Sequence, residues 1–172
     1  MVLRKRIKGN KKGSLQDIAF IIAVLFFFAF VALFGFKISS EFNDYAQSSD
    51  TITAEGKTAA DSLTSMYPGV IDNAFLFLMI GLSLVILIFA ALVRVHPIFM
   101  FLFIIGWIFM VFLAGVFSNI YQEAASTPEL INYAGQFTFI DNLMTILPMF
   151  VGVFGIIVMV FLYKMGNPGL TQ

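Results

Sequence analysis

The sequence predicts an all-α integral membrane protein with four transmembrane helices and short amphipathic helices in its outer loops. Of its 172 residues, 60% are hydrophobic and only 12% are charged, whereas about 25% of the residues of a soluble domain are charged. Four windows contain no Asp, Glu, Lys, Arg or His, and they are 18–36, 73–93, 98–118 and 143–163. None of these windows alternates apolar and polar residues as the strands of a membrane barrel do.

Each of the four windows is long enough to cross a membrane as a helix. About 20 apolar residues span the ~30 Å hydrocarbon core, and in lipid the backbone must bond within its own segment, which favours helices. Only four residues, 94–97, join the second window to the third, so these two helices are expected to form an antiparallel pair. The remaining segments are a basic tail at 1–17, outer loops at 37–72 and 119–142, and a C-terminal tail at 164–172.

The positions of the basic residues predict the orientation. Six of the ten precede the first window, and they are Arg4, Lys5, Arg6, Lys8, Lys11 and Lys12. Arg94 and Lys164 fall on the same side, whereas the longer loops of the other side hold Lys37 and Lys57 alone. Because Lys and Arg are enriched on the cytoplasmic face, we expect both termini inside, in an inner or cytoplasmic membrane or the internal membrane of a virion.

The basic tail before the first apolar window predicts an uncleaved signal anchor. A cleaved secretory signal is the alternative, but the apolar run has 19 residues and no small-x-small site follows it. We expect the six cations of the tail to bind anionic lipid headgroups of the inner leaflet. Non-specific contact with nucleic acid or another acidic partner is the second interpretation of the same charges.

The segment KKGSLQD, residues 11–17, followed by a long apolar run, resembles the leader of type IV prepilins. In that family cleavage follows the Gly, which is Gly13 here, and an acidic residue stands five positions after the cut. Asp17 is the fourth residue after Gly13, and three further spans are foreign to pilins. The resemblance covers about 25 residues and implies a processed N-terminus.

The outer loop 37–72 is predicted to contain a helical hairpin. Nothing breaks a helix before Ser48, so the first helix is expected to continue beyond the membrane. Ser49 and Asp50 offer an N-cap for a second, short helix, and Pro68-Gly69 is expected to end it. That helix carries an apolar stripe of Ile52, Ala59, Leu63 and Met66. The alternative is a solvated loop that orders only partly against the bundle.

The outer loop 119–142 is predicted to contain one amphipathic helix lying in the interface. Thr127 would cap it and Pro128 would occupy its first position. Apolar residues from Leu130 to Phe137 would form its buried face. The loop has no basic residue, so we expect it to pack on the hairpin or to meet a protein partner.

Small residues within the spans are candidates for close helix packing, because helix backbones approach one another in lipid where side chains are small. They are Gly35, Gly81, Gly106, Gly115, Gly152 and Gly155. Pro148 is expected to kink the fourth span and to free a carbonyl that Thr145 or a neighbour satisfies. Such a kink can act as a gate, but a purely structural role is favoured. Trp107 lies mid-span and is expected to pack on another helix.

The sequence lacks the residues from which catalytic centres are built. No span contains an ionisable residue. The spans therefore lack the charged side chains that proton relays, voltage sensors and coupled-ion sites use. The chain has no Cys and a single His, His96, and no phosphate loop or nucleophile elbow occurs. We therefore predict no catalytic residue, metal site, cofactor or small-molecule substrate, and expect a protein that is not an enzyme.

These features favour a non-enzymatic structural or assembly protein of a lipid bilayer. By size, basic tail and Phe-rich spans the chain resembles small multi-span membrane proteins of membrane-containing viruses and mobile elements. The resemblance implies a homo-oligomer or partner membrane or capsid-like subunits, with the tail facing the genome and the acidic loops facing the capsid. The alternatives are a holin-like pore and an accessory subunit of a membrane transport or secretion complex.

Overall fold

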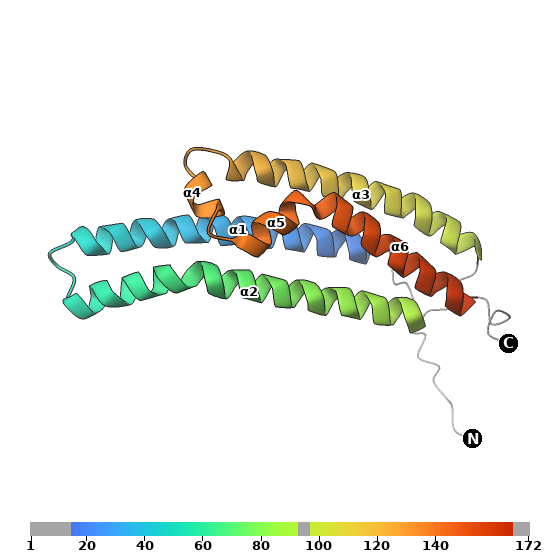
Figure 1. Ribbon diagram of the computed structural model, residues 1–172, viewed down its shortest axis with the longest axis horizontal. Helices are drawn as coiled ribbons and strands as arrows, with labels where there is room; N and C mark the ends of the chain where they lie inside the picture. The colour runs from blue at the N-terminus through green and yellow to red at the C-terminus, as the bar shows by residue number, and fades with distance from the viewer. Residues whose placement is uncertain (1–14, 93–96, 167–172) are drawn as a thin grey trace, which may run out of the picture.

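The computed structural model describes residues 15–92 and 97–166, and within these ranges the chain is helical with no strand (Figure 1). The helices are α1 Leu15–Ser48, α2 Ala54–Leu92, α3 Pro97–Ala125, α4 Ile131–Ala134, α5 Thr138–Thr145 and α6 Leu147–Gly166. This confirms the predicted all-α fold class. It also confirms that the first helix continues to Ser48, well past the end of its apolar window at residue 36.

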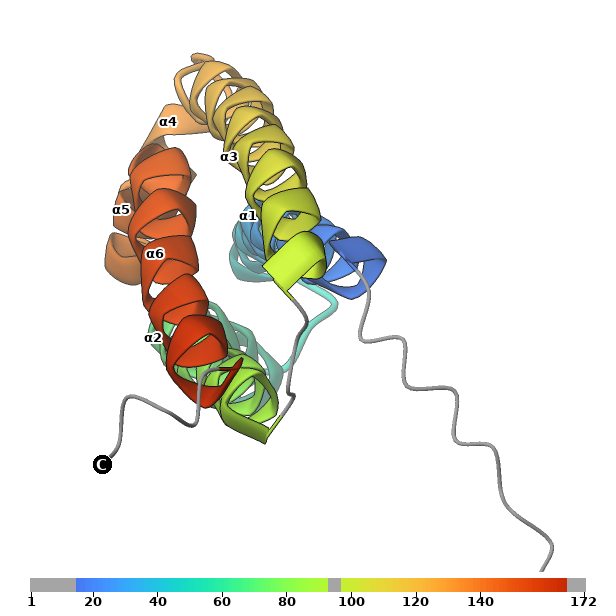
Figure 2. The ribbon, with the colours of Figure 1, turned by 90° about the vertical axis from the view of Figure 1, so that its right-hand side faces the viewer.

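The four long helices α1, α2, α3 and α6 form an elongated bundle. In it α1 packs on α2 and α3, and α6 packs on α2 and α3, which gives the ring order α1, α2, α6, α3 (Figure 2). The beginning of α1 and the end of α6 lie at the same end of the bundle (Figure 1). We term this the inner end, and we term the opposite end, which carries the α1–α2 turn and the short helices α4 and α5, the outer end.

Three helices are long and apolar enough to cross a membrane, namely Ala19–Ser48, Ala54–Ala91 and Met100–Ala125. A fourth crossing exists if the bent pair Thr138–Thr145 and Leu147–Tyr163 is counted as one span. The protein is therefore a membrane-embedded helical protein. Large apolar side chains are exposed along all four long helices, as expected where lipid replaces water around a bundle.

The chain bends by 74° between α5 and α6, beside Pro148, where a kink of the fourth span was expected. Pro148 explains part of the break. Its ring nitrogen carries no proton, so the carbonyl of Met144 loses its helical donor. The hydroxyl of Ser118, on α3, donates instead to the carbonyl of Thr145 at 3.3 Å. The break therefore places a backbone acceptor against a neighbouring helix.

The expectation that Pro68-Gly69 ends a short helix is wrong, because α2 runs unbroken through Pro68. A proline inside a helix costs about 3 kcal/mol, but α1 lies alongside α2 over this stretch. The Thr64 hydroxyl, one turn earlier, contacts the Ser39 hydroxyl at 3.0 Å and bonds the Ser39 carbonyl at 3.2 Å. Packing on α1 therefore keeps α2 straight enough to continue.

The predicted caps of both outer helices are wrong as well. Thr53 caps α2, since its hydroxyl accepts the amide proton of Gly56 at 3.2 Å. The Ser49 hydroxyl bonds Thr51 within the turn instead. The Thr127 hydroxyl donates back to the carbonyl of Ala124 at 2.8 Å, so it does not cap a following helix.

The single amphipathic helix predicted after Pro128 is replaced by two shorter ones. Pro128 precedes α4, which has only four residues, and the chain then turns before α5 begins. Phe137 lies between them and is fully buried. The chain turns at Gly135 and Gln136, which separates α4 from α5 and directs the Phe137 ring into the core.

Candidate functional site

The described residues hold no group of three or more His, Cys, Asp or Glu side chains placed to bind a metal ion. Two features of the outer end stand out instead. One is the outer part of α1 and α2, residues 37–72, whose tip projects past the other helices and which we term the outer hairpin (Figure 1). The other is the tightly packed region beneath α5, which closes the space between the four helices.

The outer hairpin extends well beyond a bilayer-sized layer. At 1.5 Å per residue, the 34 residues of α1 and the 39 of α2 are about 51 and 58 Å long, against a ~30 Å hydrocarbon core. Its tip lies past the ends of α3 and α5 (Figure 1). The two arms are joined near the tip by Gln47, whose amide donates to the carbonyl of Lys57, while the Lys57 ammonium donates to the carbonyl of Gln47, both at 2.9 Å.

One face of α1 remains apolar and exposed above its predicted apolar window. Ile38, Phe42 and Tyr45 are 67%, 58% and 65% exposed. Their spacing of four and three residues places them on one face of the helix. The same stripe continues toward the inner end through exposed Phe34 and Val31, where it would face lipid. The hairpin thus extends an apolar stripe past the level at which charged residues begin.

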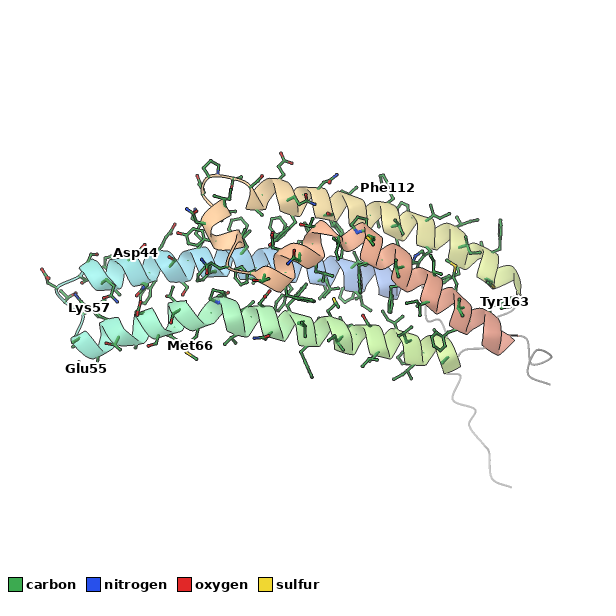
Figure 3. All side chains as sticks on the ribbon, viewed as in Figure 1. Asp44, Glu55, Lys57, Met66, Phe112 and Tyr163 are labelled. Atoms are coloured by element: carbon green, nitrogen blue, oxygen red, sulfur yellow. The ribbon has the colours of Figure 1, made fainter. Side chains whose placement is uncertain are left out.

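A second exposed apolar stripe lies on α2 and includes Leu63, Met66 and Val70. Figure 3 shows Met66 on the side of α2 away from α1. Leu63 and Met66 were predicted to form an apolar face together with Ile52 and Ala59. The residues that α2 buries in this region are Ala60 and Pro68, so the face with Leu63 and Met66 points outward.

Both lysines of the outer segments are engaged within the protein. The Lys37 ammonium lies 3.2 Å from the Glu129 carboxylate and 3.8 Å from that of Glu41. The hydrogen bond with Glu129 raises the pKa of Lys37, which follows the apolar window 18–36 directly. Lys57 is held by Gln47 as described. The remaining charge on the exposed hairpin is acidic, and Figure 3 shows Asp44 and Glu55 on its two arms.

Asp72 holds α5 against α2. Its two carboxylate oxygens accept the amide protons of Phe139 at 2.7 Å and Ile140 at 2.8 Å. The first amides of a helix have no partner inside the helix, and α5 has no side-chain cap of its own at Phe137. Asp72 therefore supplies the cap from another helix, where its negative charge also matches the positive end of the helix dipole. No sequence pattern near 138 pointed to it.

The region beneath this cap, termed the outer plug, contains the largest fully buried side chains of the described residues. They are Leu33, Phe75, Tyr121, Phe137, Ile140, Met144 and Leu147. The rings of Phe36 and Phe137 pack edge to face with centroids 5.6 Å apart. The hydroxyl of Tyr121 is buried here without a hydrogen-bond partner among the described residues. These side chains fill space between the helices at the outer end of the bundle.

An apolar cavity of about 40 Å³ lies between the four long helices. Its lining includes Leu25, Leu82, Ser83, Trp107, Val151 and Phe154. Trp107 is buried, and its indole nitrogen has no partner within the described ranges. Trp107 packs on α6 at Gly155, as its mid-span position indicated. The cavity is small and apolar, so it offers little room for a polar pathway.

The glycines singled out for helix packing behave differently from one another. A methyl group at Gly155 would overlap the Trp107 indole, and one at Gly35 would overlap the Tyr67 hydroxyl. At Gly152 the same methyl would only touch Val111, at 4.0 Å. A methyl group at Gly81 or Gly115 would meet no atom within 4 Å, so helices do not approach closely there. Gly106 is half-buried.

The basic cluster Arg4, Lys5, Arg6, Lys8, Lys11 and Lys12 lies outside the described residues. His96 and Arg94 also lie outside them. Comparison with known proteins gives no further guide, because no family model, curated protein sequence or solved structure is similar to this chain.

Proposed function

We propose that this protein is a non-enzymatic assembly component of a membrane, anchored by its helical bundle and docked to other subunits through the outer hairpin. The apolar stripe of Ile38, Phe42 and Tyr45 carries the proposal. Contiguous large apolar side chains left exposed above the membrane level are typical of protein interaction surfaces. The length of α1 supports this proposal, because at about 51 Å it exceeds the ~30 Å hydrocarbon core and the stripe would then lie within reach of a partner outside the bilayer.

The charge distribution supports an orientation with both termini inside. The start of α1 and the end of α6 lie at one end of the bundle. This is the arrangement expected of a chain that crosses the membrane an even number of times. The basic tail with Arg4 to Lys12 would then lie at the inner leaflet and bind anionic lipid. In a virion the same tail would face the genome, and the acidic hairpin would face a protein shell.

The packing favours assembly over a holin-like pore. The outer plug fills the space between the helices with seven fully or almost fully buried side chains, and the cavity below it is only about 40 Å³. A conducting path would need both to open. An accessory subunit of a transport or secretion complex would use the same hairpin in the same way, and it differs from a virion component only in the identity of the partner.

The proposal is tested by native mass spectrometry of the protein released from its source membrane with its neighbours attached, together with a dye-leakage assay in vesicles. We expect a defined homo-oligomer or a complex with a second subunit, and vesicles that stay tight. A lone monomer in mild detergent would contradict the proposal. A monomer that also releases dye would favour the pore.

A further inference from the structure

We propose that the face of α1 formed by Ile38, Phe42 and Tyr45 docks an amphipathic helix whose apolar side chains are flanked by Lys or Arg. This inference rests on the proposed assembly function and adds the chemistry of the partner. We term these three side chains the docking face. From Ile38 to Tyr45 it covers two helical turns, about 10 Å, which matches the spacing at which an apolar helix presents anchors at i, i+3 or i+4, and i+7.

The docking face is available for binding. Each of its three side chains is more than half exposed, although the neighbouring face of α1 packs on α2. Ala46 and the Ser39–Thr64 contact occupy that packed face. The docking face therefore takes no part in holding the hairpin together, and an occupant can cover it without rearranging the fold.

The charges around the docking face determine which occupant fits. Glu41 and Asp44 lie beside it on α1, and both are exposed. Lys37 is paired with Glu129 and Glu41, and Lys57 is bound to Gln47, so both lysine ammonium groups already have partners within the protein. A partner with basic residues beside its apolar anchors would meet complementary charge.

A second copy of this chain fits the docking face poorly. Two-fold pairing places the same surface on both sides of an interface, so Glu41 and Asp44 would face acidic residues of the other copy.

Lipid also fits the docking face poorly. Charged side chains are expensive in the hydrocarbon core, and Lys37, Glu41 and Asp44 all lie at or beyond the inner edge of the docking face.

Photo-crosslinking in the source membrane tests the partner chemistry. A benzoyl-phenylalanine is placed at Phe42, and a matched one is placed at Phe112, an equally exposed phenylalanine of α3 (66%) within the apolar window 98–118 (Figure 3). We expect the probe at 42 to form an adduct with a peptide of another protein in which two or more Lys or Arg flank apolar residues. We expect the probe at 112 to form lipid adducts.

Charge variants provide the second arm. The double variant E41Q/D44N should lower the yield of the protein adduct at position 42 by about three- to tenfold at low salt, because two exposed ion pairs are lost. The control D50N changes an acid in the turn at the hairpin tip and should leave the yield unchanged. Both variants alter exposed side chains, so we expect neither to affect folding. An unchanged thermal midpoint checks this.

Three results would overturn the inference. They are an adduct at 42 with another copy of this chain, lipid adducts alone at 42 as at 112, and a protein partner whose crosslinked segment is acidic or uncharged. If native mass spectrometry still shows a defined complex alongside any of these results, the assembly function stands. Only the docking face, or the proposal that its partner is basic, is then refuted. Absence of any complex would refute the proposed function itself.

Discussion

The carboxylate of Asp72 in α2 bonds the backbone amide of Ile140 at 2.8 Å, although the two residues are 68 positions apart in the sequence. With the bond to Phe139 at 2.7 Å, this contact caps α5 and fixes it across the outer end of the bundle. The Asp72 cap thus positions α5 over the outer plug, and removal of the cap should lower the stability of that whole region.

Replacing Asp72 by Ala should destabilise the fold by about 1–3 kcal/mol, because two amides at the start of α5 lose a charged acceptor. Asp72→Asn retains one oxygen acceptor and should fall between the Ala variant and the wild type. Asp61→Ala is the control, since the Asp61 carboxylate makes only a long, exposed contact of 3.5 Å with Asn43. Thermal unfolding in detergent measures all three, and equal midpoints for the Asp72 and Asp61 variants would contradict the capping role.

Gly155→Ala should destabilise the protein by about 1–3 kcal/mol, because the new methyl group overlaps the Trp107 indole and over-packs the α3–α6 contact. Gly81→Ala should be neutral or slightly stabilising, since its methyl meets no atom within 4 Å and alanine is the better helix former. Trp107 is the only tryptophan of the chain. Its emission therefore reports the local disturbance, and an unchanged spectrum with unchanged stability in Gly155→Ala would refute the contact.

A double-mutant cycle tests the contact between Gly35 of α1 and Tyr67 of α2. Gly35→Ala should destabilise the hairpin base, because the methyl group overlaps the Tyr67 hydroxyl. Tyr67→Phe removes that hydroxyl and should recover part of the loss, giving a coupling energy of about 0.5–3 kcal/mol between the two sites. If the two effects simply add, the residues do not share a contact.

The long apolar helices could be predicted from the sequence because charge and hydropathy depend on the residues of one segment alone. The kink at Pro148 was also expected, but neither the size of the bend nor the continuation of α2 through Pro68 could be predicted. Pro68 stays inside a continuous helix where α1 packs alongside, whereas Pro148 stands next to a 74° break where Ser118 and Asp72 hold the displaced backbone. Each outcome depends on what a distant segment places beside the proline.

Distant contacts also give different roles to acidic residues that have similar surroundings in the sequence. Asp61 and Asp72 both lie on α2, eleven positions apart, and both could be solvated charges. Only Asp72 is at the level where the first amides of α5 need an acceptor. The exposed stripe of α1 was likewise hidden in the sequence, because helical spacing shows that Ile38, Phe42 and Tyr45 share a face but not which face α2 covers.

Removing the Glu129 partner of Lys37 should have little effect on stability at neutral pH, because exposed ion pairs contribute little. The pair raises the pKa of Lys37 above its ordinary value of 10.5. Its contribution is therefore fully present below the ordinary lysine pKa and is lost as pH rises through the raised value. The small difference in thermal midpoint between the wild type and Glu129→Gln should vanish at strongly alkaline pH. A difference that grows with pH would contradict this sign.

The bend between α5 and α6 should survive the removal of Pro148 alone. Pro148→Ala restores an amide donor for Met144, but the Asp72 cap and the Ser118 bond to Thr145 still hold α5 in place. The combination Pro148→Ala with Asp72→Ala should allow the two helices to straighten. Spin labels on cysteines at Thr138 and Val160 can measure this, because both positions are exposed and the chain has no cysteine of its own.

Electron–electron distance measurements between these labels distinguish the two states. At 1.5 Å per residue, a straight helix would separate residues 138 and 160 by about 33 Å, and a 74° bend shortens this by about 6 Å. We expect the short distance in the wild type and in Pro148→Ala, and a population at the long distance in the double variant. A long distance in Pro148→Ala alone would show that the proline, and not the contacts made by Asp72 and Ser118, maintains the bend.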